Sequence, residues 1–122
     1  MKKWVKALRS DKFKQGAGTL KQFNSKGQAQ HCCLGVLCEL YNEHMRKNKK
    51  KILREKIRNN DIGFSFVLFD DRRDDLPNEV MIWSGINDSF GNFNGYCLSD
   101  MNDLGQKFKT IADIIEKNWE SL

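Results

Sequence analysis

The sequence predicts an α+β protein in which a small antiparallel β-sheet packs against a central helix and a C-terminal helix. Apolar residues recur at helical spacing in residues 31–41 and again in residues 108–119, which predicts two helices. Residues 64–69 are rich in aromatic and branched side chains, which favour a strand. With 122 residues, 39% of them hydrophobic, the chain is expected to form a single domain over residues 1–122.

The first half of the chain is predicted to begin with a short helix over residues 2–10, whose apolar residues share one side. A basic, glycine-containing loop follows at residues 11–18. Residues 19–32 have the pattern of a hairpin, because the turn-forming sequence 24–27 ends in glycine between two short strand-like runs. The second strand leads into the central helix, and residues 46–58, eight of them basic, are predicted to continue that helix.

The second half is predicted to contain shorter elements. They are a turn at residues 59–63, a strand at 64–69, a charged loop at 70–75, a short helix at 76–85, a long loop at 87–95, an edge strand at 96–98 and a final helix at 108–119. The short helix is predicted from Pro77 in its first turn and Gly85 at its end.

Charge is distributed unevenly along the chain. Residues 1–60 contain 16 Lys and Arg against 4 Asp and Glu, a balance of +12, whereas residues 61–122 contain 5 against 12, a balance of −7. Such asymmetry is expected for a surface that binds anions, or for two halves that complement each other within the fold or in a homo-oligomer. No apolar run approaches the roughly 20 residues of a membrane span, and the N-terminus lacks the apolar region of a signal peptide. A cytoplasmic protein with no membrane partner is therefore expected.

The four cysteines are Cys32, Cys33, Cys38 and Cys97. Their spacing and the expected compartment predict reduced, mostly buried thiols, with no metal and no cofactor. A metal site in which His31, Cys32, Cys33 and Cys97 meet in space stays open as the alternative. A thiol at the strand-to-helix junction, Cys32 or Cys33, is a conceivable nucleophile, because a helix N-terminus lowers a thiol pKa. However, His31 is adjacent in sequence and His44 lies about three turns along the helix, so no catalytic Cys–His pair is expected.

Four motifs resemble those of a family of small proteins from tailed bacteriophages and prophages. They are W-x-x-A-L-R-S from Trp4, C-C-L-G-V-L-C from Cys32, L-P-x-E-V-M-x-W from Leu76 and N-D-x-G-x-x-F-x-x-I-A-D from Asn102. Asp11 and Met101 depart from the family pattern, which has glycine and leucine there. The resemblance covers most of the chain except residues 46–70 and 87–95, which are expected to be variable insertions. It implies a phage gene product in the host cytoplasm, but no reaction.

In that setting we expect a small, non-enzymatic binding protein that counteracts a host defence or host factor, by sequestering a nucleotide-derived ligand or by binding a host protein. The candidate ligand-binding residues are Lys12, Lys14, Gln15, Trp83, Asn102 and Asp103. The lysines would meet phosphates, and Trp83 or Trp4 would stack on a ring. Asn102 and Asp103 would hydrogen-bond a base or ribose or, as the alternative, cap the helix that follows them.

Two other functions stay open. The basic segment could bind nucleic acid through Lys49, Lys50, Lys51, Arg54 and Arg58, although it has no aromatic side chain that could stack on bases. A small hydrolase acting on nucleotides is the third possibility, with thiols or the carboxylates of Asp100 and Asp103 as its reactive groups.

Overall fold

The computed structural model of the protein describes residues 2–60 and 63–122, and it has the predicted α+β architecture. The turn predicted at residues 59–63 includes positions 61 and 62, which lie outside the described residues. The helices in the described part are α1 (Lys2–Arg9), α2 (Cys33–Lys47), α3 (Asn78–Ser84), α4 (Leu98–Asp103) and α5 (Phe108–Asn118), followed by a 3-10 turn, η1 (Trp119–Ser121). The strands there are β1 (Lys21–Phe23), β2 (Ala29–His31), β3 (Glu55–Asn59), β4 (Ser65–Phe69), β5 (Asn92–Phe93) and β6 (Tyr96–Cys97).

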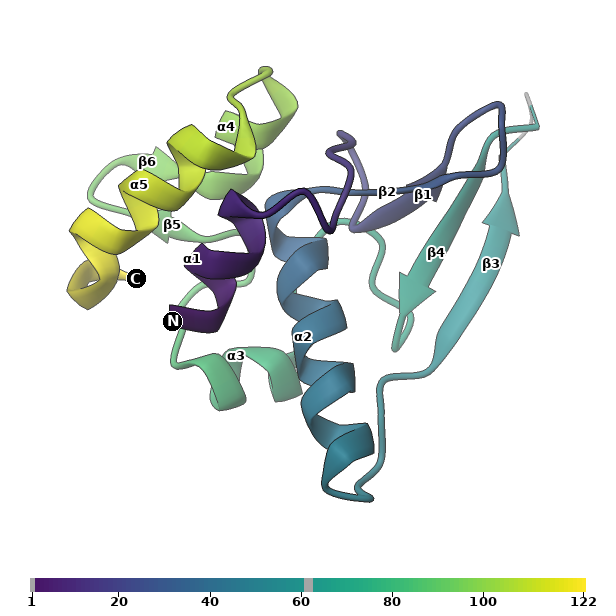
Figure 1. The fold of residues 1–122 in the computed structure, drawn as a ribbon, viewed down its shortest axis with the longest axis horizontal. Coiled ribbons are helices and arrows are strands. Elements are labelled where there is room, and N and C mark those ends of the chain that lie inside the picture. The colour runs from purple at the N-terminus through teal and green to yellow at the C-terminus, as the bar shows by residue number, and fades with distance from the viewer. Residues whose placement is uncertain (1, 61–62) are drawn as a thin grey trace.

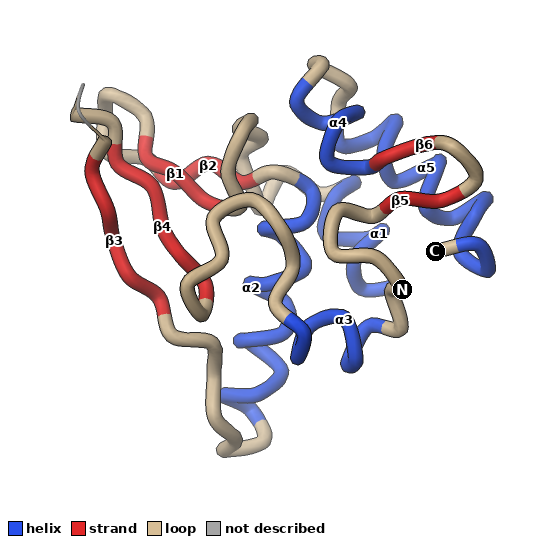
Figure 2. The backbone as a smooth tube through the Cα atoms, turned by 180° about the vertical axis from the view of Figure 1, so that it is seen from behind, coloured by secondary structure: helices blue, strands red, loops and turns tan. Residues whose placement is uncertain are grey.

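Helix α2 is the centre of the fold, as predicted. It lies between the four-stranded sheet on one side and the other helices on the other side (Figures 1 and 2). Its residues from Cys33 to Cys38 are all buried, which is the pattern of a helix covered on every side. Helix α5 packs mainly on α1, so the C-terminal helix completes the helical layer.

The larger sheet has the strand order β2-β1-β4-β3, and every neighbouring pair is antiparallel. In the β1–β2 hairpin Lys21 lies opposite His31, and on β4 Val67 lies opposite both Lys21 and Ile57. Gln15, in the loop before β1, forms a parallel bridge with His31 and so covers the outer edge of β2.

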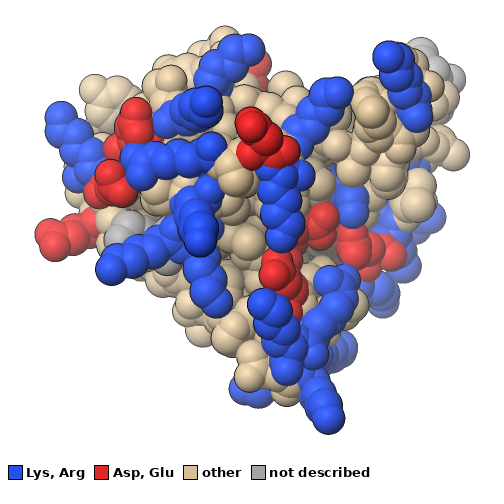
Figure 3. All heavy atoms as spheres, in the orientation of Figure 1, with Lys and Arg blue, Asp and Glu red and all other residues tan. Residues whose placement is uncertain are grey.

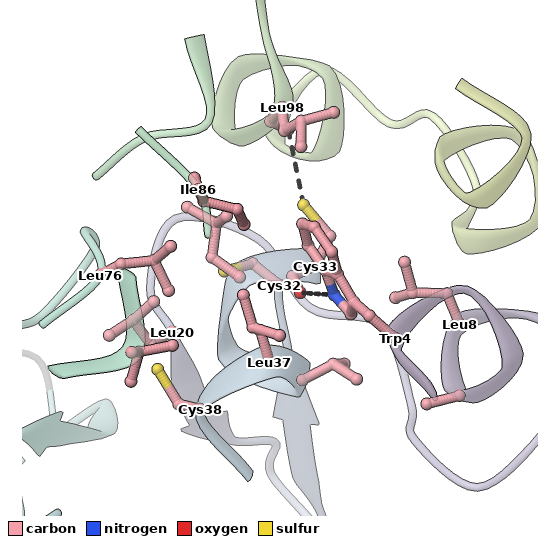
Figure 4. Packing of buried hydrophobic residues seen from close by; sticks show 14 of the residues in the cluster. Trp4, Leu8, Leu20, Cys32, Cys33, Leu37, Cys38, Leu76, Ile86 and Leu98 are labelled. Atoms are coloured by element: carbon pink, nitrogen blue, oxygen red, sulfur yellow. Dashed lines mark hydrogen bonds between the residues drawn. The ribbon is translucent and has the colours of Figure 1, made fainter. Parts of the chain in front are cut away.

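The apolar core surrounds the first turns of α2 (Figure 4). Cys33 points toward Leu98 of α4, and its carbonyl oxygen accepts a 2.9 Å hydrogen bond from the Trp4 indole of α1. Gly35 faces the chain that enters β1, and a Cβ atom at this position would overlap the carbonyl group of Leu20. The helix and this segment can therefore approach so closely only because residue 35 has no side chain.

The central helix includes residues 46 and 47 but does not continue through 48–58, so the prediction of a helix over this stretch is wrong. Helix α2 ends at Lys47, where the Asn48 side chain donates to the His44 carbonyl at 2.8 Å and Lys49 has a positive φ of 54°. The chain then reverses and forms β3 at the edge of the sheet. The helix propensity of this lysine-rich stretch is overridden by pairing with β4, a strand that lies further along the chain.

Three smaller differences lie in the second half of the chain. Residues 98–103, for most of which no element was predicted, form α4, and residues 92–93 within the predicted loop form β5, which pairs with β6. Pro77 is the N-cap of α3 and not a residue of its first turn. Elements this short depend on contacts with the rest of the fold more than on a periodic pattern.

The expected insertion at 46–70 contains β4, which is a central strand of the sheet.

Candidate functional site

Asn102 is the centre of a polar cluster at the N-terminus of α2. Its side-chain oxygen accepts hydrogen bonds from the Cys33 backbone N–H at 3.1 Å and from Gln15 Nε2 at 3.0 Å. Its amide nitrogen donates to the Gly16 carbonyl at 2.7 Å, and the residue is only 2% exposed. Both polar atoms of the Asn102 amide are thus engaged inside the fold, where they cap α2 and hold the loop that precedes β1.

Gln15 and Asp103 extend the same cluster, which we call the polar clip (Gln15, Asn102 and Asp103). Gln15 Nε2 also donates to the Gln106 carbonyl at 2.7 Å, and Gln15 Oε1 accepts from the Phe108 N–H, the first residue of α5, at 3.0 Å. Asp103 accepts from the Gly18 N–H at 2.9 Å. Gln15, near the N-terminus, thus lies in the same cluster as Asn102 and Asp103, near the C-terminus. The cap of α5 comes from Gln15 and not from the two residues predicted for it.

The buried cysteines have the environment of structural thiols. Burial raises the pKa of Cys32 to about 11 and the pKa values of Cys33 and Cys38 well above the ordinary value. Cys32 is the N-cap of α2, and its sulfur accepts from the Gly35 N–H at 3.4 Å. Because desolvation outweighs the hydrogen bonds that favour the thiolate, none of these three thiols has the environment of a nucleophile.

Thiol labelling tests this assignment. We expect iodoacetamide at mildly alkaline pH to add to Cys97 alone in the folded protein, because Cys97 is half-buried whereas the other three free cysteines are buried. All four should react after unfolding in guanidinium chloride, and intact mass spectrometry would count the adducts. Peptide mapping that found Cys32 modified as fast as Cys97 in the folded protein would contradict the expected burial.

His31 is engaged with charged groups between the sheet and α2. Its Nε2 lies 2.9 Å from a carboxylate oxygen of Glu39, which also pairs with Lys21 at 3.2 Å, and Lys21 reaches Glu55 at 3.2 Å. Burial raises the pKa of Glu39, but the His31 hydrogen bond and the Lys21 charge outweigh it, so the net shift is downward. His31 therefore contacts a carboxylate and not a thiol.

A groove between α1 and α2 brings together all three tryptophans of the chain. Its first part, the aromatic hollow, has a volume of about 380 Å³ and is lined by Trp4, Trp83 and Trp119. Lys2 and Lys3 of α1 form its rim, and apolar side chains of α2 line it as well. Trp4 is buried, whereas Trp83 and Trp119 are half-buried and offer part of their ring surfaces.

Trp83 is held in place by α2. Its ring packs edge-on against Tyr41, with centroids 5.5 Å apart, and lies 5.6 Å from the His44 ring. Tyr41 and His44 are three residues apart and so lie on one side of the helix. The ring that the sequence predicted for stacking is thus positioned by packing before any ligand arrives.

The groove continues into a second part, the lysine hollow, of about 360 Å³. Its charged residues are Lys3, Lys6, Lys12, Glu43 and Lys47. Lys3 and Leu40 line both hollows, so the two are adjacent. On the face shown in Figure 3, lysine and arginine side chains gather over α1 and along α2.

The predicted site residues therefore separate into two places. Lys12 and Trp83 lie in the groove, whereas Gln15, Asn102 and Asp103 form the polar clip. Lys14 lies apart from both, with its amine 3.2 Å from the Gln28 side chain. The charged and aromatic residues of the groove that the sequence analysis did not select are Lys2, Lys3, Lys6, Glu43, His44, Lys47 and Trp119. Two signals pointed to them: the basic side of α1, and the spacing that places Leu40, His44 and Lys47 on one face of α2.

The basic residues considered for nucleic-acid binding do not share one helix face. Residues 49–51 lie in the exposed chain that follows α2, and Arg58 is exposed on β3. Arg54 pairs with Asp71 at 2.9 Å, and Arg72 in the same charged loop pairs with Asp75 at 3.1 Å.

Two further properties concern metals and membranes. Within residues 2–60 and 63–122, no three side chains of His, Cys, Asp or Glu are grouped as metal ligands. None of the described helices combines the length and the apolar character needed to cross a membrane.

The fold and the groove define a small α+β protein with a basic, tryptophan-lined surface groove. The chain belongs to the family described as Domain of unknown function (DUF8296), whose model matches residues 1–119. This match includes both stretches that were expected to be insertions, 46–70 and 87–95. No curated protein and no solved structure was found to match the chain.

Proposed function

We propose that this protein is a small, non-enzymatic binding protein that holds a nucleotide-derived ligand in the α1–α2 groove. The observation that carries the proposal is the aromatic hollow, where three tryptophans meet beside two lysines. An apolar concave surface with a few cationic groups at its rim is typical of sites for ligands that combine a planar ring with anionic groups.

The two half-buried tryptophans supply the ring-binding part of the site. Stacking of a base on an aromatic side chain is worth about 1–3 kcal/mol. Trp83 is already held by Tyr41 and His44, so little side-chain entropy would be lost when a ring stacks on it. Lys2 and Lys3 would attract the negative charge of the same ligand.

The phage resemblance gives this binding activity a setting. In a host cytoplasm, such a protein would counteract a defence by withholding a nucleotide-derived signal, and the ligand would be released unchanged. In a second form of this proposal, the same groove binds a host protein. An aromatic side chain of that protein would then take the place of the base.

Nucleic-acid binding is the second candidate. It is favoured by the position of Lys47, which lines the groove. The exposed lysines 49–51 follow it closely in the chain, so the basic surface extends beyond the groove. The salt dependence distinguishes the two candidates, because binding through many phosphates weakens steeply with salt, whereas binding dominated by ring stacking does not.

A titration of intrinsic tryptophan fluorescence with adenosine and ADP tests the proposal. We expect saturable quenching by both, and about a tenfold or greater loss of affinity in Trp83→Ala, because one stacking contact is removed. Tyr96→Ala is the matched control, since Tyr96 is an aromatic residue, 60% exposed, outside the groove. Chromatography of the recovered ADP should show no conversion, in agreement with a non-enzymatic role.

Thermal unfolding of Trp83→Ala must be measured alongside the titration, because this residue also packs on Tyr41. The proposal fails if neither probe gives saturable quenching with the unaltered protein. It fails equally if a folded Trp83→Ala variant binds as tightly as the Tyr96→Ala control.

A further inference from the structure

We propose that the lysine hollow is a polyphosphate subsite, in which Glu43 occupies the place of a phosphate group until a ligand displaces it. This inference rests on the proposed function and deepens it, because it specifies the ligand as a nucleotide that carries more than one phosphate. The basic side chains come from three parts of the chain: Lys3 and Lys6 from α1, Lys12 from the following loop and Lys47 from α2.

The charges of this hollow are not balanced. Glu43 is the one carboxylate among its lining residues, and its two oxygens lie 3.4 Å from Lys12 Nζ and 3.5 Å from Lys47 Nζ. Within the described residues, no carboxylate lies at ion-pair distance from Lys3 or Lys6. Four ammonium groups thus share a single internal anion, which leaves an excess of positive charge around the hollow.

The shape of the hollow fits a chain of phosphates better than a single one. Leu40 lies at the junction with the aromatic hollow, and Lys47 lies seven residues further along α2, about 10 Å by helical rise. This length accommodates more than one linked phosphate group. A ring held at Trp83 would leave its phosphates pointing along the groove toward Lys12 and Lys47, past Lys3, which lines both parts.

Glu43 is suited to displacement. Its side chain is 42% exposed, so its pairs with Lys12 and Lys47 have the small net stability of surface ion pairs. The hydrogen bond from Lys12 is the main reason that the pKa of Glu43 is lowered, so the carboxylate stays ionised on these two lysines in the empty groove. A phosphate carries more charge and more acceptor oxygens than the carboxylate, and would take over both amines.

Nucleic acid offers the same phosphates as a free nucleotide. We favour the nucleotide because the lysine hollow lies next to the aromatic hollow, so one ligand that carries both a ring and phosphates can use both. A polynucleotide that bound through its backbone would not need Trp83, whereas a nucleotide would bind through both hollows together.

The experiment uses the full chain and calorimetric titration with AMP, ADP, ATP and inorganic tripolyphosphate, which has no ring. We expect the affinity to rise from AMP to ATP, and tripolyphosphate to bind with measurable affinity. Glu43→Gln should bind tripolyphosphate about three- to tenfold more tightly, because the internal competitor is removed. The control is Asp74→Asn, which removes the same charge from an exposed loop outside the groove and should change the affinity much less.

A second pair of variants tests the lysines. Lys6→Gln should weaken ATP binding, whereas Lys26→Gln, at an exposed lysine of the β1–β2 turn, should not. Equal affinities for AMP, ADP and ATP would overturn the subsite, and so would equal effects of Glu43→Gln and Asp74→Asn. In either case the Trp83 test with adenosine would still decide the proposed function independently.

The remaining outcomes are also decisive. Tripolyphosphate binding that responds to Glu43→Gln, without any adenosine binding, would support the phosphate subsite while contradicting ring binding at the tryptophans. A single-stranded oligonucleotide that binds more tightly than ATP, with a steep salt dependence and no effect of Trp83→Ala, would overturn the nucleotide in favour of a polynucleotide.

Discussion

Gly35→Ala is expected to destabilise the protein by at least about 3 kcal/mol, although the same change in most helices is favourable. Helix propensity alone predicts a gain of about 1 kcal/mol, because alanine is the better helix former. In this structure the new Cβ would overlap the carbonyl group of Leu20 and lie 2.6 Å from its carbon atom. The obstacle is backbone, which cannot rotate away as a side chain can, so α2 and the chain entering β1 would have to separate.

Denaturant unfolding followed by circular dichroism measures this effect. The matched control is Gly27→Ala in the β1–β2 turn, where a Cβ would meet nothing within 4 Å but the φ of 76° is unfavourable for alanine. The control should lose about 1–2 kcal/mol from backbone strain alone. A Gly35→Ala variant as stable as the unaltered protein would show that the contact between α2 and Leu20 is not as close as described.

The elements that the sequence predicted correctly are those whose pattern is local. Helix α2 was found from a run of apolar residues at helical spacing, and β4 from its aromatic and branched residues. Both elements lie in the core because their apolar side chains are buried. In contrast, β3 contains only one apolar residue, Ile57, which is 63% exposed, so its identity as a strand depends on pairing with β4.

The candidate site was only partly predictable for the same reason. Trp83 was selected as a ring that could stack on a ligand, but Trp119, which lines the same hollow, is 36 residues away and is brought near by the packing of α5 on α1. The end of α2 at Lys47, followed by Lys49 with a positive φ, has no strong local signal, since lysine rarely adopts positive φ. Asn102 was expected to bind a ligand or to cap the helix that follows it, whereas its side-chain oxygen accepts from the N–H of Cys33, 69 residues earlier in the chain.

The buried hydrogen bonds of Asn102 lead to the second prediction of a large loss of stability. Asn102→Leu is expected to lower the free energy of unfolding by about 3 kcal/mol or more, because a side chain of similar size would leave two buried groups without this partner, the Cys33 N–H and the Gly16 carbonyl. Gln15 Nε2 would also lose one of its two hydrogen bonds and keep the one to the Gln106 carbonyl. Each buried polar group that loses its partner costs about 1–3 kcal/mol, and water can reach only the outer part of this cluster.

Asp103→Ala is the matched control for Asn102→Leu. It is the next residue in the same clip, but it is exposed and accepts a single hydrogen bond, from Gly18, so its loss should cost less than about 1 kcal/mol. Urea unfolding of both variants, with hydrogen exchange at the Cys33 amide, would separate the two effects. Faster exchange at Cys33 is expected in Asn102→Leu alone, because only this change removes the acceptor of the Cys33 N–H. If the two variants lost equal stability, the burial of Asn102 would not be the source of its effect, and the clip would be a surface contact that a ligand could still share.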